Sequence, residues 1–194
     1  MDAIWARLVE AGMPFMLHIG LPATALDKRY SNNGRFQGTS VDAGGEVILS
    51  KDMLGIHHAH ETFLGAMVLD GVFERFPSLR GGVIEAGAGW VPALLRRLDW
   101  IADIWRRSEP ELAAFTRKPS QQIIDQMIFT PYAFEDVGAL IRDSDNRLYA
   151  FSSDYPHVEG GRTPLERFEK SLAASSESDK QRFYTDNFAD TFRI

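Results

Sequence analysis

The 194-residue chain is 44% hydrophobic with a formal net charge of −6, a composition that predicts one globular domain spanning residues 1–194. Acidic and basic residues are mixed along the sequence, so no basic stripe is available for nucleic acid, and no apolar run approaches the roughly 20 residues that span a bilayer. Because cysteine is absent, disulfides and thiolate metal sites are excluded, and any metal ligands must be His, Asp or Glu.

The chain opens with an amphipathic helical pattern at residues 1–12 rather than a signal peptide, which predicts a cytoplasmic protein. Four short apolar runs without polar alternation then predict buried strands at 13–19, 81–86, 126–130 and 148–153. Helical patterns follow them at 61–76, 90–105, 133–143 and 163–175, and a last helix is expected at 178–192. This alternation predicts an α/β fold with a parallel sheet and right-handed crossovers.

Residues 20–52 are rich in Gly, Asn and Ser and contain no clear periodic pattern. A loop of this length inside a compact domain is either a functional lid or a mobile excursion, and the sequence leaves both open.

Four polar residues stand at the ends of the predicted strands: His18, Glu85, Thr130 and Asp154. Because the carboxyl ends of parallel strands meet at one edge of a sheet, we expect these side chains to converge there. A His, a Glu and an Asp together suit a divalent cation. Each residue alone also has a local explanation, since a strand-end His can be a hydrogen-bonded structural residue and Asp154 a turn or cap residue.

The histidine cluster at residues 57–60 has the His-x-His spacing of two ligands on one strand, but helical residues follow it. On a helix, His57 would share a face with His60 or Glu61, and His58 and His60 would diverge. A structural or substrate-lining role is therefore favoured over metal binding.

Two other patterns after the strands bear on chemistry. Gly87 and Gly89 follow a strand and precede a helix, but the G-x-G-x-x-G and P-loop patterns are absent, so we expect close backbone approach near Glu85. Ser152 and Ser153 lie in no nucleophile motif, which argues against a serine hydrolase.

Several segments in order, "MPFMLHIG", "GVFERFPSLR", "AGAGWVP", "IFTPYAFEDVGALI" and "FSSDYPH", resemble the amidohydrolase-related family, which includes aminocarboxymuconate semialdehyde decarboxylase. The resemblance implies a partial TIM barrel, corresponding to the carboxyl-terminal half of the family's (β/α)8 fold. It also implies a divalent metal, with zinc expected. By motif, His18 and Asp154 match the metal ligands, Asp154 also being the base-like residue.

The resemblance assigns further roles and also shows departures. Glu85 stands where many decarboxylase members have a His, and it is the second expected catalytic residue. His157 and Trp90 are the expected substrate contacts. The family's paired ligands on the first barrel strand have no counterpart before Met13. Since catalytic zinc usually has three protein ligands, the metal site is expected to be incomplete in this chain.

The resemblance therefore predicts a metal-dependent hydrolase that acts on a small carbonyl- or carboxylate-bearing substrate through a metal-activated water. A decarboxylase of the same family and a truncated non-catalytic homologue remain alternatives. A flavodoxin-like nucleotide-binding domain is a third, disfavoured by the missing phosphate loop. The expected partners are a small-molecule substrate and either further copies of the chain or a missing amino-terminal half.

Overall fold

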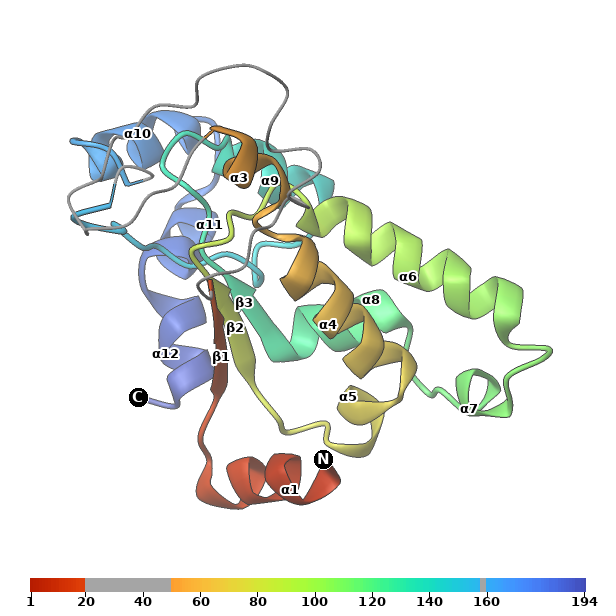
Figure 1. The fold of residues 1–194 in the computed structure, drawn as a ribbon. Coiled ribbons are helices and arrows are strands. Elements are labelled where there is room, and N and C mark those ends of the chain that lie inside the picture. The colour runs from red at the N-terminus through yellow and green to blue at the C-terminus, as the bar shows by residue number, and fades with distance from the viewer. Residues whose placement is uncertain (20–49, 158–159) are drawn as a thin grey trace.

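A computed structural model describes residues 1–19, 50–157 and 160–194, and it has an α/β fold (Figure 1). Three strands, β1 (Phe15–His18), β2 (Gly81–Ile84) and β3 (Met127–Phe129), form one parallel sheet in the order β1-β2-β3. Gly81 pairs with Phe15 on one side and with Met127 on the other. The predicted fold class is confirmed, and the first three predicted strands are present.

Helices precede, connect and follow these strands. Their bounds are α1 (Asp2–Ala11), α3 (Ser50–Gly55), α4 (His58–Leu69), α5 (Val72–Arg75), α6 (Val91–Trp105), α7 (Pro110–Ala113), α8 (Pro119–Gln126), α9 (Val137–Asp143), α10 (Pro164–Ser171), α11 (Glu177–Gln181), the π-helical η1 (Arg182–Asp186) and α12 (Asn187–Phe192). None of the helices in the described ranges combines the length and apolar character that crossing a membrane requires.

The helices pack in two groups around the sheet. Helices α4 and α8 contact each other, and each also contacts α5 and α6. Figure 1 shows α4, α6 and α8 on the right of the strands. Helix α12 contacts β3 and lies on the left. Fully buried side chains from both groups and from the sheet form one core, with Leu64, Phe73, Val83, Phe129 and Phe183 among its members.

The glycine at the start of β2 allows β1 to approach it closely. A Cβ atom on Gly81 would lie 2.5 Å from the ring of Phe15, far inside contact distance. That ring in turn packs against Trp5 of α1, with 5.5 Å between ring centroids. The small residue therefore makes room for the aromatic contact that seats the first helix below the sheet.

The predicted fourth strand at 148–153 is wrong as a full strand. A single parallel bridge joins Phe129 to Tyr149, and Ala150 N donates to Phe129 O over 3.0 Å. The next residue turns away, because Phe151 N donates to Phe183 O instead of to β3. The Phe151 ring then packs edge-on against Phe168, with 5.7 Å between centroids. Pairing with the carboxyl-terminal helices thus replaces pairing with the sheet.

Other differences concern the helices. Helices α3, α7 and α8 were not predicted, and the single helix expected at 178–192 is divided by the π-helical segment η1. Helix α10 begins at Pro164 as expected, with Thr163 as its N-cap residue but without a side-chain cap hydrogen bond. Residues 20–49, which include most of the predicted long loop, lie outside the described residues.

Candidate functional site

Two of the predicted site residues meet at the carboxyl ends of adjacent strands. His18 is the last residue of β1, and Glu85 directly follows β2. His18 Nε2 lies 3.1 Å from Glu85 Oε1. The convergence expected from parallel strands is therefore present for this pair.

The hydrogen bond at Nδ1 of His18 leaves the other ring nitrogen, Nε2, as the one that could bind a metal. His18 Nδ1 lies 2.6 Å from the carbonyl oxygen of Ile19, and a carbonyl can only accept, so Nδ1 carries a proton. Nε2 is then either the lone-pair nitrogen of a neutral ring or the second N–H of an imidazolium. The former can bind a cation, and the latter forms an ion pair with the Glu85 carboxylate.

The backbone at Glu85 adopts the left-handed conformation, with φ of 57°. This conformation is uncommon for a residue with a side chain and is found most often where surrounding contacts enforce it. Here Tyr132 Oη donates to the carbonyl oxygen of Glu85 over 2.9 Å. Gly87, two residues on, has φ of 60°, and a Cβ atom there would lie 2.8 Å from the Tyr132 ring. The expected close backbone approach beside Glu85 is confirmed.

A half-buried carboxylate that sequence reasoning missed fixes the turn after Glu85. Glu135 accepts hydrogen bonds from the backbone N–H groups of Ala88 at 3.0 Å, Gly89 at 2.6 Å and Tyr132 at 2.7 Å. Burial raises the pKa of Glu135, and the three N–H donors act against that rise. Glu135 thereby ties the loop after β3 to the loop after β2.

The sequence contains one weak signal for Glu135. Residue Asp136 is the N-cap of α9 and accepts a hydrogen bond from Ala139 N, so Glu135 stands just outside the helix. Glu135 lies six residues past the end of β3 and just before an N-cap, so its side chain can turn back toward the neighbouring loop. Two of its three donors, the N–H groups of Ala88 and Gly89, are 47 and 46 residues away in sequence, so the pattern alone could not identify the contact.

Trp90, an expected substrate contact, borders the same turn. Its indole N–H donates to the carbonyl oxygens of Ala86 and Gly87 at 3.1 and 3.0 Å. The ring lies nearly parallel to His57, with 5.7 Å between centroids and a 19° angle between planes. Because the N–H is used within the protein, contact with a substrate would have to come from the indole ring.

The histidine cluster is helical, as helix geometry predicted. His57 is the N-cap residue of α4, and its Nε2 lies 3.8 Å from Glu61, one turn on. Burial lowers the pKa of His57, with the neighbouring His58 acting in the same direction. His60 is buried, 8% exposed, and its Nδ1 has no hydrogen-bond partner among the described residues. Within the cluster, His57 therefore stacks on Trp90, whereas His60 is a core residue.

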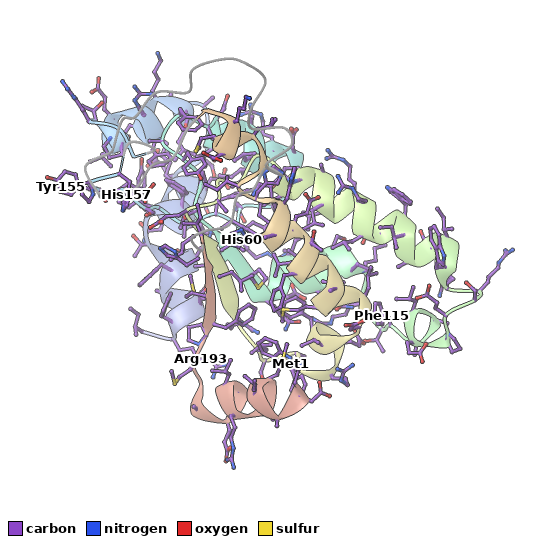
Figure 2. All side chains as sticks on the ribbon, viewed as in Figure 1. Met1, His60, Phe115, Tyr155, His157 and Arg193 are labelled. Atoms are coloured by element: carbon purple, nitrogen blue, oxygen red, sulfur yellow. The ribbon has the colours of Figure 1, made fainter. Side chains whose placement is uncertain are left out.

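Asp154 and His157 occupy a turn at the edge of the molecule. Asp154 has φ of 53°, and its carbonyl oxygen accepts from His157 N over 2.8 Å. In Figure 2, His157 and Tyr155 lie together on the left, well separated from His60 on α4. Thr130, the remaining predicted strand-end residue, directly follows β3, and its backbone N–H donates to Val83 O, which continues the pairing of β3 with β2.

Comparison with known proteins gives the family. The amidohydrolase family matches the sequence over residues 1–194. This chain belongs to the amidohydrolase family. Among curated proteins, the sequence has no significant match.

Solved structures of family members resemble the fold. An amidohydrolase from Mycobacterium avium subsp. paratuberculosis K-10 is 28% identical, with a TM-score of 0.74, and the match covers 98% of this chain and 45% of that one. The 5-carboxyvanillate decarboxylase of Sphingomonas paucimobilis is 20% identical, with a TM-score of 0.67 and coverage of 98% and 52%. A 2,6-dihydroxybenzoate decarboxylase from Rhizobium is 17% identical, with a TM-score of 0.66 and coverage of 99% and 55%. The chain thus spans about half the length of these TIM-barrel proteins.

The residues of the site fit a divalent cation only in part. Two ligand atoms about 2.1 Å from one tetrahedral zinc ion lie roughly 3.4 Å apart, so the 3.1 Å between His18 Nε2 and Glu85 Oε1 suits an ion pair better than two ligands of one zinc ion. A ring N–H donated to a backbone carbonyl, as from His18, is typical of metal-binding histidines. However, no group of three or more His, Asp and Glu suited to a metal occurs in residues 1–19, 50–157 and 160–194.

Proposed function

We propose that this chain is part of a metal-dependent decarboxylase that removes the carboxylate group of a small aromatic acid. The observation that carries the proposal is the 3.1 Å contact between His18 and Glu85 at the carboxyl ends of two adjacent strands. The decarboxylases among the similar structures support the substrate class, since one was solved with 2,6-dihydroxybenzoate and another with manganese and a nitrobenzoic acid.

His18 and Asp154 are the residues that would hold the cation, which when bound stabilises negative charge on the carboxylate of the substrate. The remaining ligands would come from outside the described residues of this chain. Manganese or zinc suits such nitrogen and oxygen donors. His157 and Trp90 would bind the body of the substrate.

The chemical step needs a proton donor. Decarboxylation breaks the bond between a ring carbon and the carboxylate carbon, leaves the electron pair on the ring carbon, and requires one proton there as carbon dioxide departs. Glu85 in its protonated form would supply this proton and finish as a carboxylate. Its backbone is positioned for this by Tyr132, and the following turn by Glu135. Asp154 is the second acid that could exchange the proton.

Hydrolysis is the second candidate, favoured by the 28% identical structure described as an amidohydrolase. In that reaction Glu85 would act in the opposite direction, accepting a proton from the attacking water. The two reactions therefore need opposite protonation states of Glu85, protonated for decarboxylation and ionised for hydrolysis. A non-catalytic homologue is the third outcome of the test.

The experiment measures carbon dioxide released from 2,6-dihydroxybenzoate and 5-carboxyvanillate by the chain assembled with the partner that supplies the remaining ligands, in the presence of Mn²⁺ or Zn²⁺. We expect release that falls about 10²–10⁴-fold in Glu85→Gln with bound metal unchanged, because a general acid is removed. His18→Asn should lower bound metal as well. Glu166→Gln, an exposed carboxyl on α10, is the matched control.

Three results would contradict parts of the proposal. Hydrolysis of ester or amide substrates without carbon dioxide release would replace the decarboxylase with a hydrolase. No turnover by that assembly with any of these substrates would favour the non-catalytic homologue. Stoichiometric zinc binding by the isolated chain without a partner would refute the inference that ligands are missing.

A further inference from the structure

A cavity of about 540 Å³ lies at the amino ends of the strands, away from the candidate site. It is lined by Met127 and Ile128 of β3, by Arg80 just before β2, and by residues of α8, η1 and α12. Figure 2 shows Arg193, which follows α12, near the lower end of the strands, and His157 in the upper left. The candidate catalytic residues at the carboxyl ends therefore do not account for this cavity.

The cavity is positively charged in an acidic protein. Four arginines line it, Arg80, Arg117, Arg147 and Arg182, together with two acidic residues, Asp125 and Asp190. The lining has a formal surplus of two positive charges, whereas the whole chain has a net charge of −6. Such a local excess attracts small anions.

Two of these arginines are neutralised by carboxylates inside the protein. Arg147 forms a two-armed contact with Asp145, at 2.9 and 3.0 Å, and a third contact with Asp125 at 3.2 Å. Arg117 lies 3.4 Å from the same Asp125 and donates to Phe73 O. Their charges are balanced within the fold.

The other two arginines are not balanced in this way. Arg80 Nη1 donates to the carbonyl oxygens of Pro77 and Leu79, and within the described ranges Arg80 forms no ion pair. Burial and the neighbouring cations Arg193 and Arg117 lower the pKa of Arg80, and the more distant carboxylates of Asp125 and Asp190 act against that lowering. Arg182 lies 3.6 Å from Asp190, whose side chain is 74% exposed, and such pairs contribute little.

The polar frame around these arginines is already satisfied. Gln126 is buried and donates to Leu79 O over 3.1 Å. Asn187 is buried and donates to Tyr149 O over 2.8 Å. Thr191 donates to Asn187 O over 2.8 Å. Donors available to a ligand therefore come from the arginines, and the frame that holds them is fixed by internal hydrogen bonds.

We infer that this cavity binds a small molecule carrying a dianionic group, either a phosphate or a pair of carboxylates, through Arg80 and Arg182. The planar guanidinium matches the oxygen spacing of both groups and binds them with charge-assisted hydrogen bonds. Arg80 and Arg182, whose charges are not balanced in the way those of Arg117 and Arg147 are, would face the two negative charges of such a ligand. The cavity is separate from the candidate catalytic site, so its ligand would be distinct from the substrate.

The test is an NMR titration of the full chain that follows the arginine Nε–H resonances. The probes are inorganic phosphate and succinate, with acetate at equal ionic strength as the monovalent control. We expect saturable shifts at Arg80 and Arg182 with phosphate, succinate or both, and the stronger probe identifies the chemistry. Affinity should fall about tenfold or more in Arg80→Gln and in Arg182→Gln, since one charge-assisted contact is lost.

The matched control is Arg96→Gln, an exposed arginine on α6, which should bind as the unaltered chain does. Arg80→Lys retains the charge and should lose less affinity than Arg80→Gln. Thermal unfolding verifies that each variant is folded, and Arg182→Gln gives an independent result if Arg80→Gln is not. Equal shifts with acetate, no saturation with either dianion, or unchanged affinity in a folded arginine variant would overturn the inference.

Discussion

Replacing Glu135 with Gln tests whether one carboxylate holds the turn behind Glu85. The carboxylate accepts from Ala88, Gly89 and Tyr132 through two oxygens. Gln has one oxygen, so if it keeps the Gly89 contact, its NH₂ group meets the N–H of Tyr132 across the 2.7 Å position. One buried donor is then unsatisfied, which costs about 1–3 kcal/mol. For a chain of this size, 2 kcal/mol corresponds to a fall in Tm of about 4–8 °C.

The assay is thermal unfolding combined with amide hydrogen exchange. Exchange should accelerate selectively at Tyr132, Ala88 and Gly89, because their acceptor is altered. Glu166→Gln on the exposed face of α10 is the control for loss of a carboxylate. If Glu135→Gln unfolds at the temperature of that control, with exchange at the three amides unchanged, the turn is held by something other than Glu135.

Three further predictions concern stability. Gly87→Ala should lower the free energy of unfolding in urea by about 1–3 kcal/mol, because φ is 60° and the methyl group would lie 2.8 Å from Tyr132; an unchanged midpoint would contradict this. Burial raises the pKa of Asp145, but hydrogen bonds from Arg147 outweigh it and the folded pKa lies below 3.8, so Asp145→Asn should cost about 1–2 kcal/mol at pH 7. That difference should vanish in urea titrations as pH falls through the folded pKa, and a difference that persists in acid would refute the ionic cause. Burial lowers the pKa of His57, so the unfolded chain takes up a proton at a higher pH than the folded chain does, and stability should fall as the pH drops below the unperturbed value of 6.5. In thermal melts, His57→Gln should remove this part of the pH dependence. A pH profile of Tm that is the same in the variant would contradict the assignment to His57.

The sheet was predictable because its strands are short apolar runs, and burial on both faces needs such runs. Helix α8 was not predicted because part of its buried face is polar. Its buried face includes Gln122 and Gln126, 0% and 1% exposed, which read as surface residues in the sequence. Gln126 is stabilised by donating to Phe76 O and Leu79 O, some fifty residues away, and no local pattern reports such contacts.

The same distinction applies to the site. The proximity of His18 and Glu85 was predictable because each stands at the end of an apolar run, and the register of parallel strands brings those ends together. Glu135 and Tyr132 were missed because they act through backbone groups of another loop. The prediction of the fourth strand was wrong because Phe151 N donates to Phe183 O in the carboxyl-terminal helices, and this competing acceptor is in place only after the chain has folded.

The left-handed backbone at Glu85 and Asp154 places two acids in a conformation that favours glycine. Each position costs of order 1 kcal/mol compared with glycine. A search for stabilising substitutions would therefore select glycine at both and remove both candidate acids together. In a library sorted first for thermal resistance and then for turnover, Glu85 and Asp154 should be the residues at which the two rankings oppose each other.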